Sequence, residues 1–524
     1  MNNNGLKNNP ILKEDLTGRD RLLSNVLFSW GSYLVFVVAG FVMPRMIDRH
    51  LGQVTLGIWD FCWSLVSYLN LAGLGIGSSV NRYVAKYRAA NDIDKLRKAV
   101  SSVMCIQLIV AAVVLIITGI FVWLLPVFFQ NRLGINIKIA QSVVGFLGAS
   151  FAIQMALDTS RGVITGCHRW DLHNFINSGS YAVTVVLMIA VLLLGGNLNH
   201  ISLVYLCAVA VSEVTRTIMA YRICPELHVS WKYVSFPQAR EMLLFGGKSI
   251  IAGLPQLLLV QTNNILIASF LGPASLAVIS RPIALVRHME TFMNKFAFVL
   301  TPTTSSLQGS GQTAQVPQFL LNTTRYGVAI VLPMVLFLAI FGDVILKLWM
   351  GTQYANGALL AILAAGYMLP VSQNSVINIL TGLNMHGRVG LINLILVSAL
   401  FGLGIIIINF TGWSLSASAL LIAVPLTIGN GIFIPVCACS KLGIPITKYI
   451  RHTFLAPFLC ALVPGLCMAL SRILLSNNAM TSLGFVVIIG TLLTALIYWK
   501  YIFPESIRSR ISGRMTGKIA VQKS

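Results

Sequence analysis

One apolar stretch near the middle of the chain is crowded with ionisable side chains. Residues 274–307 contain Arg281, Arg287, His288, Glu290 and Lys295. Inside a membrane helix a charged group costs about 2.5 to 3.5 kcal/mol on insertion scales, so such groups tend to face a cavity or a partner. If this stretch spans a membrane, it is the first candidate for a functional site.

Three of these side chains share one helical face. Arg281, His288 and Lys295 are seven residues apart, so they drift by only about 20° per step and cover about 21 Å of helix. An Arg fork binds phosphate oxygens in pairs and stays charged when desolvated, so this face predicts a cationic ladder for a diphosphate. The alternative is that the residues sit near the ends of an over-long helix and snorkel to lipid headgroups.

The role of His288 stays open between a proton carrier and a hydrogen-bonded interior residue. On the opposite face, Arg287 and Glu290 are three residues apart, which favours a structural ion pair. Asp158 and Arg161 have the same spacing and predict a second structural pair.

Two residues nearer the N-terminus complete the candidate cavity set. Arg45 follows Pro44 at the end of an apolar run, where a proline can kink a helix and free carbonyl groups. Asp60 lies about six residues into the next run. It has three possible roles: an ion-pair partner for Arg45, a cation or proton site, or an exposed residue at the helix entry.

A basic segment follows this second run, with Arg82, Lys86 and Arg88 ahead of a Lys95–Lys98 cluster. The segment is interpreted as a cytoplasmic loop that anchors on anionic headgroups. The alternative is a basic mouth that captures substrate.

Other motifs argue against metal, cofactor and nucleotide chemistry. Most of the nine cysteines lie inside apolar runs, and Cys437 and Cys439 have no second ligand pair nearby, so no metal or disulfide is predicted. Gly247-Lys248-Ser249 imitates the end of a P-loop, but the first glycine of that motif is replaced by Met242. No cofactor and no enzymatic activity are expected.

The elements that position these residues follow from composition. Of 524 residues, 56% are hydrophobic and 10% charged, with a mean hydropathy of +0.81, whereas soluble domains are about 25% charged. A bilayer core needs roughly 20 apolar residues per helix. We therefore predict an all-α polytopic membrane protein with about fourteen spans: 26–47, 54–80, 99–125, 139–164, 175–195, 200–222, 242–271, 274–307, 319–349, 356–383, 389–410, 414–440, 450–474 and 480–502.

The net charge of +22 is interpreted as membrane topology, and no nucleic acid is expected as a partner. With the N-terminus inside, 28 Lys and Arg residues fall on the cytoplasmic side and six on the other. This positive-inside bias predicts an even number of spans and two cytoplasmic termini. The segment 1–25 is polar and resembles no signal peptide.

An internal repeat organises the spans. The Leu51-Gly52 string recurs as Leu271-Gly272, and Thr165-Gly166 recurs as Thr381-Gly382. The two recurrences have nearly the same offset along the chain, which predicts two pseudo-symmetric six-helix lobes plus two C-terminal helices. The predicted segments are an N-terminal segment 1–25, an N-lobe 26–222, a C-lobe 242–440, two further spans within 450–502, and a basic cytoplasmic tail 503–524.

The region 44–85 contains a string of motifs that resembles the polysaccharide flippases of the multidrug/oligosaccharidyl-lipid/polysaccharide exporter superfamily. The strings are Pro44-Arg-Met-Ile, Leu51-Gly-Gln-Val-Thr-Leu-Gly-Ile-Trp, Leu71-Ala-Gly-Leu-Gly-Ile-Gly and Asn81-Arg-Tyr-Val-Ala, with Gly166-Cys-His-Arg169 resembling the family's Gly-x-x-Arg turn. The resemblance implies a two-lobed transporter with a central cavity. By alternating access it would flip a polyprenyl-diphosphate-linked oligosaccharide, such as an O-antigen or lipopolysaccharide precursor, to the outer leaflet.

The resemblance also implies a bacterial inner membrane location. Expected partners are the lipid-linked glycan, membrane lipids, and the polysaccharide polymerase and export machinery. Two alternatives remain. A multidrug or organic-cation antiporter of the same superfamily would need cavity carboxylates, which are few here. A membrane-embedded glycan polymerase or glycosyltransferase would need a large polar loop or a catalytic carboxylate motif.

Overall fold

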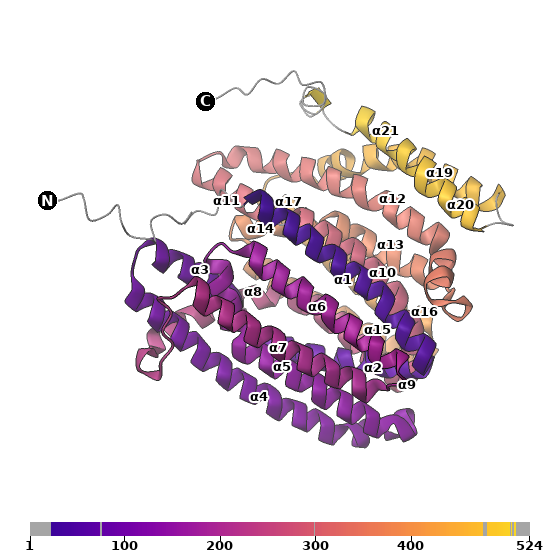
Figure 1. The fold of residues 1–524 in the computed structure, drawn as a ribbon. Coiled ribbons are helices and arrows are strands. Elements are labelled where there is room, and N and C mark those ends of the chain that lie inside the picture. The colour runs from indigo at the N-terminus through magenta and orange to yellow at the C-terminus, as the bar shows by residue number, and fades with distance from the viewer. Residues whose placement is uncertain are drawn as a thin grey trace. The chain divides into compact units, whose positions relative to one another are not determined.

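The computed structural model describes residues 22–73, 76–297, 299–474 and 479–502, together with 505, 508 and 509. Every regular element in these residues is a helix (Figure 1), which confirms the all-α prediction. The predicted N-terminal segment 1–25 and the basic tail 503–524 lie almost entirely outside the described residues.

The chain divides into two compact units. Unit 1 runs to Leu257 and resumes over Asn264–Ala277, and unit 2 comprises Leu258–Asn263 and continues from Val278. The helices up to the division are α1 (Leu22–Leu51), α2 (Gln53–Ser67), η2 (Tyr68–Gly73), α3 (Ile76–Ala89), α4 (Ile93–Leu133), η3 (Gly134–Asn136), α5 (Ile137–Gly166), α6 (Trp170–Leu193), α7 (Leu198–Ile223), η4 (Trp231–Tyr233), α8 (Phe236–Leu257), η5 (Leu258–Thr262) and α9 (Asn263–Phe270).

Unit 1 is built from long helices packed along their lengths. In it α1 packs against α6, α6 against α7, α7 against α5, and α5 against α4, and Figure 1 shows these helices running alongside one another. The shorter α3 packs against α4, α5 and α8. A buried cluster that includes Tyr83, Val103 and Ile164 joins these elements.

Unit 2 contains most of α10 and all later helices. They are α10 (Pro273–Ala297), α11 (Leu300–Gly309), η6 (Thr313–Gln315), α12 (Val316–Met350), η7 (Thr352–Tyr354), α13 (Gly357–Ser372), α14 (Asn374–Gly382), α15 (His386–Thr411), α16 (Leu415–Leu426), η8 (Thr427–Phe433), α17 (Ile434–Lys441), α18 (Ile446–Ile450), η9 (Arg451–Leu455), α19 (Ala456–Leu474), α20 (Ala479–Phe485), η10 (Val486–Gly490) and α21 (Thr491–Tyr501). At its centre α12 packs against α13, α14 and α19.

Ten helical stretches in the described residues are long and apolar enough to cross a membrane. One of them, Ile93–Gly166, contains two predicted spans, because η3 joins α4 to α5. The predicted spans 54–80, 242–271 and 274–307 are not among these ten stretches of the described residues, and they stay predictions. The chain is thus a multi-pass helical membrane protein, and the count of fourteen stays a prediction.

The basic segment expected to be a loop is largely helical. Arg82, Lys86 and Arg88 lie on α3, and α4 begins at Ile93, so the Lys95–Lys98 cluster forms its first turns. Asp92 caps α4 by accepting a hydrogen bond from the backbone N–H of Lys95 at 3.1 Å. The expectation was wrong because Lys and Arg are good helix formers, whereas the prediction treated every charged run as a break between spans.

The repeat landmarks adopt the same backbone geometry in both halves of the chain. Gly52 and its counterpart Gly272 have φ of 85° and 88°. After the two Thr-Gly pairs, His168 and Asn384 both have φ of 57°. Three backbone hydrogen bonds around His168 recur around Asn384, with every donor and acceptor displaced along the chain by the same offset. The helix-ending turn is therefore the same structure twice.

Side-chain packing around these turns also recurs. A Cβ added to Gly166 would lie 2.9 Å from the carbonyl oxygen of Asn81, and one added to Gly382 would lie 2.7 Å from that of Thr301, the counterpart of Asn81 in the second half. Both glycines therefore allow a close approach between the end of one helix and its neighbour, α5 with α3 in the first half and α14 with α11 in the second. In each half this glycine brings the end of a helix against the element that precedes the next long helix.

Candidate functional site

The predicted ladder residues lie on α10, in the part of this helix that belongs to unit 2. Their burial changes along the helix. Arg281 is buried, with 4% of its surface exposed, His288 is half-buried, and Lys295 near the C-terminal end is exposed. The face thus grades from an accessible cation at one end of α10 to a buried guanidinium about 21 Å away.

The C-terminal end of α10 is fixed by neighbouring helices of unit 2. Met293 lies against Gly327 of α12. Asn294, next to Lys295, accepts a hydrogen bond from the side-chain amide of Asn374 at the start of α14. These contacts hold the position from which Lys295 projects.

A buried polar network begins beside Asn374. Gln373, at the break between α13 and α14, accepts a hydrogen bond from the Tyr449 hydroxyl at 2.6 Å and donates one to the Gly431 carbonyl at 2.7 Å. The hydroxyls of Thr324 and Ser375 lie 3.0 Å apart. Gln373, Tyr449 and Thr324 are all buried. Since a buried polar group is costly unless it is bonded, the network holds α12, α14, η8 and α18 in one arrangement.

The other two ionisable residues of α10, Arg287 and Glu290, were predicted to lie on the face opposite the ladder. Arg287 is exposed and Glu290 is half-buried, and their pairing stays a prediction. On α5, an Arg161 guanidinium nitrogen lies 3.4 Å from an Asp158 carboxylate oxygen, and more than half of the Arg161 side chain is exposed. A pair with one partner mostly exposed to solvent adds little stability.

Arg45 and Asp60 lie in unit 1, on α1 and α2, and both are half-buried. The three residues of the α10 face belong to unit 2. The Ser64 hydroxyl donates a hydrogen bond to the backbone carbonyl of Asp60 at 2.9 Å. Their assignment to a cavity stays a prediction.

Of the predicted basic mouth, Arg82 and Lys86 are exposed and Arg88 is half-buried. The Lys86 ammonium lies 5.7 Å from the centre of the Tyr87 ring and 6.0 Å from that of Tyr83. The Tyr83 hydroxyl in turn donates a 2.5 Å hydrogen bond to Glu241 of α8. These residues thus form a helical surface beside aromatic rings, with Arg82 and Lys86 exposed; their role as a substrate mouth stays a prediction.

One buried ionic group was missed by the sequence analysis. Glu213 and Arg216 of α7 form an ion pair, and 6% of each side chain is exposed. Arg161 and Arg216 both lie within electrostatic reach of His173 on α6. Their spacing of three residues along α7 is the sequence signal that points to such a pair.

The comparisons with known proteins agree with this architecture. A family model described as "Polysaccharide biosynthesis protein" matches residues 88–358. An uncharacterized membrane protein of Methanocaldococcus jannaschii is 24% identical over 376 residues, which are 69% of this chain and 72% of that protein.

Solved structures share the fold at low identity. The lipid II flippase MurJ in an inward closed conformation superposes with a TM-score of 0.66 at 12% identity, covering 94% of this chain and 99% of that one. An inward-facing multidrug resistance MATE family transporter of the MOP superfamily gives 0.63 at 17% identity, covering 79% and 94%. An outward-facing MATE family transporter gives 0.56 at 15% identity, covering 80% and 95%.

Proposed function

Because the chain belongs to the polysaccharide biosynthesis protein family, we propose that it flips a polyprenyl-diphosphate-linked oligosaccharide from the inner to the outer leaflet. The substrate would be a precursor of a cell-surface polysaccharide such as an O-antigen or lipopolysaccharide. The fold shared with a lipid II flippase supports transport of a lipid-linked glycan. Transport, without catalysis on the glycan, is the whole of the proposed activity.

The observation that carries this proposal is the graded cationic face of α10. Lys295 is exposed and Arg281 is buried on the same face, so an anion can first meet an accessible ammonium and then a desolvated guanidinium. A guanidinium remains charged when buried and binds two phosphate oxygens at once. His288 lies between them and would contribute a third donor to a diphosphate in transit.

The proposed architecture has fourteen spans, arranged as two pseudo-symmetric six-helix lobes and two C-terminal helices. Both termini are placed in the cytoplasm of a bacterial cell, with the protein in the inner membrane. The recurrence of the turns around His168 and Asn384 supports the duplication. Arg45 and Asp60 are proposed as further substrate-binding residues, and the polysaccharide polymerase and export machinery are the proposed partners.

A loss-of-charge variant tests the function. Arg281→Ala should abolish glycan display in cells that lack their own copy of the protein, because a buried phosphate ligand is removed from the path. Arg287→Ala removes the same charge from the exposed, opposite face of the same helix and should leave display near normal. Surface glycan is measured alongside the amount of protein in the membrane. Undiminished display by a well-inserted Arg281→Ala protein would refute the ladder.

A second candidate function has one observation in its favour, the likeness to multidrug MATE transporters. An antiporter of organic cations would bind positively charged substrates, which the cationic face of α10 repels. Efflux of a cationic dye from a transporter-deficient strain that expresses this protein separates the two functions. Dye efflux by this protein, together with normal glycan display in cells that lack their own copy of it, would favour the antiporter.

A further inference from the structure

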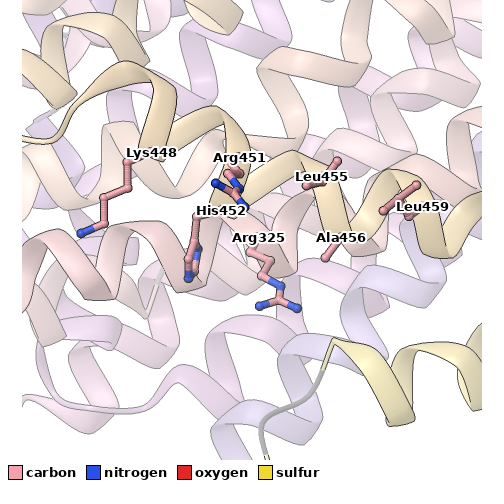
Figure 2. Close-up of a pocket in the computed structure, with 7 residues that line it drawn as sticks. All are labelled: Arg325, Lys448, Arg451, His452, Leu455, Ala456 and Leu459. Atoms are coloured by element: carbon pink, nitrogen blue, oxygen red, sulfur yellow. The ribbon is translucent and has the colours of Figure 1, made fainter.

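A second basic site lies in unit 2, away from α10. A cavity of about 400 Å³ is lined by four basic and three apolar side chains: Arg325, Lys448, Arg451, His452, Leu455, Ala456 and Leu459. Figure 2 shows the basic groups at one end of this row and the leucines at the other. We propose that this cavity binds an anionic glycerophospholipid of the cytoplasmic leaflet, with its phosphate among the basic groups.

The charge of the lining points to an anion. No carboxylate is among the described residues that line the cavity, so four cationic or protonatable groups face the same space. Like charges gathered in this way repel one another unless an anion binds between them. Lys448 and Arg451 are exposed at the rim, where they can attract a headgroup from the negatively charged surface of the cytoplasmic leaflet.

The deeper wall offers donors that no described protein group uses. The Nη2 atom of Arg325 donates a 2.9 Å hydrogen bond to the Tyr501 carbonyl, which orients the guanidinium. Its Nε atom is buried and has no hydrogen-bond partner among the described residues, and the same is true of Nδ1 of His452. A buried donor without an acceptor costs about 1 to 3 kcal/mol. A phosphate oxygen would satisfy it.

The local backbone produces this opening. Arg451 and His452 belong to the π-helix η9, between α18 and α19, and η9 packs against α12, which carries Arg325. A π-turn interrupts the regular spacing of side chains and often marks a functional site. Here it places basic side chains beside α12, and the neighbouring Tyr449 is held by its hydrogen bond to Gln373.

An apolar stripe identifies the ligand as a lipid. From the cavity it continues along α19 on spacings of three and four residues, with each leucine between 50% and 62% exposed: Leu455, Leu459, Leu462, Leu466 and Leu470. The fifteen residue steps from Leu455 to Leu470 span about 22 Å of helix, which is more than half of a bilayer core about 30 Å thick. A phosphate at one end and an acyl chain along the stripe describe a phospholipid.

Binding is tested on the full-length protein in detergent by native mass spectrometry and thermal unfolding, with phosphatidylglycerol, phosphatidylcholine, undecaprenyl diphosphate and sodium phosphate as probes. Phosphatidylglycerol should bind at one lipid per chain and raise the Tm, and the neutral phosphatidylcholine should not. A Lys448→Gln/Arg451→Gln protein should bind it roughly tenfold or more weakly, since each cation near a lipid surface contributes about fivefold. An Arg222→Gln/Arg388→Gln protein, which loses two exposed cations elsewhere, is the matched control.

Leu459→Gln should weaken binding of the lipid by severalfold without changing the charge of the cavity. The Lys448, Arg451 and Leu459 variants spare the Arg325–Tyr501 contact, so they test the site even if Arg325→Gln fails to fold. Equal lipid binding by the double variant and the control would overturn the proposal. So would exclusive binding of undecaprenyl diphosphate, which would make this a substrate site, or saturation by sodium phosphate with no added effect of lipid.

Discussion

The first half of the chain, 26–222, and the second half, 242–440, turn at matching positions but differ in how their helices run between the turns. Left-handed residues end or connect helices in both: Gly52 and Gly272, Asn91 and Gly311, Gly134 and Gly351, His168 and Asn384, Gly195 and Gly412. The separation along the chain is nearly the same in every pair. The turns are thus the constant part of the repeat.

The helices between the turns differ because of proline. In the first half α7 is continuous over Leu198–Ile223, whereas its counterpart is divided into α16, the π-helix η8 and α17. Pro425 lies just before η8, and the matching position of the first half holds Ala208. A proline inside a helix removes one hydrogen bond and clashes with the preceding turn, which displaces the backbone into a wider turn.

Buried chemistry also separates the halves. The counterpart of Arg281 in the first half is Phe61, a fully buried aromatic residue, and the counterpart of His288 is Tyr68. In contrast, a buried polar pair is retained, since Gln107 accepts hydrogen bonds from Thr159 in the first half and Thr324 lies 3.0 Å from Ser375 in the second. The two halves therefore share their turns and their buried polar pair. They differ at the positions of Arg281 and His288, where the first half has aromatic residues.

The largest expected effect comes from exchanging proline between the halves. Ala208→Pro places a proline in the middle of the continuous α7 and should destabilise the protein by about 3 kcal/mol or more. Pro425→Ala restores a backbone donor beside η8 and should leave the Tm unchanged or higher. If transport requires bending between α16 and α17, the same variant should slow transport. Thermal unfolding of the purified proteins and glycan display measure the two effects.

Leu203→Ala on the exposed side of α7 controls for substitution in that helix without a backbone change. If Ala208→Pro is tolerated, α7 shares the plasticity of α16 and the difference between the halves is not built into the helices. If Pro425→Ala unfolds the protein, the π-helix is required for packing in unit 2.

Much of this fold was predictable because membrane helices can be recognised in a sequence by their length and apolar composition. The Gly52 and Gly166 landmarks were also visible in the sequence, since only residues that tolerate a left-handed turn or a close approach recur there. The helical conformation of Arg82 on α3 and of Lys98 on α4 was not predicted, because capping by Asp92 and amphipathic packing extend helices into charged sequence. The division of α16 from α17 at Pro425 was not predicted either, because proline in a membrane helix has several possible outcomes.

The candidate site was predictable only as a helical face. The spacing of Arg281, His288 and Lys295 fixes their alignment on α10, but their burial depends on which helices pack around them. The burial of the Glu213–Arg216 pair and the cavity around Arg325 were missed for the same reason. Arg325 is far in sequence from Lys448 and Arg451, and the three come together only because α12 packs against η9.

A smaller effect is expected at the close approaches that the halves share. Gly166→Ala and Gly382→Ala each push a methyl group toward a backbone carbonyl oxygen, at 2.9 and 2.7 Å. Overpacking of this kind costs about 1 to 3 kcal/mol, and both proteins should unfold at a lower temperature. Gly179→Ala, where an added Cβ meets nothing within 4 Å, should match the original protein. A loss in only one of the two variants would show that the turns are alike in backbone but not in packing.

The smallest effect concerns a difference at the start of the paired helices α4 and α12. Asp92 caps α4 and contacts the Lys95 ammonium at 2.7 Å, while Gln315 before α12 makes no side-chain cap. Asp92→Ala should speed hydrogen exchange at the Lys95 amide roughly fivefold, and Gln315→Ala should change nothing at the matching amide of Gln318. Hydrogen bonds from Lys95 lower the pKa of Asp92. The protection from its charged form is therefore present above about pH 4 and lost as the pH falls through the lowered pKa. Asp92→Asn keeps a capping oxygen and should retain protection without that pH dependence; pH-dependent protection in this variant would assign the titration to another group.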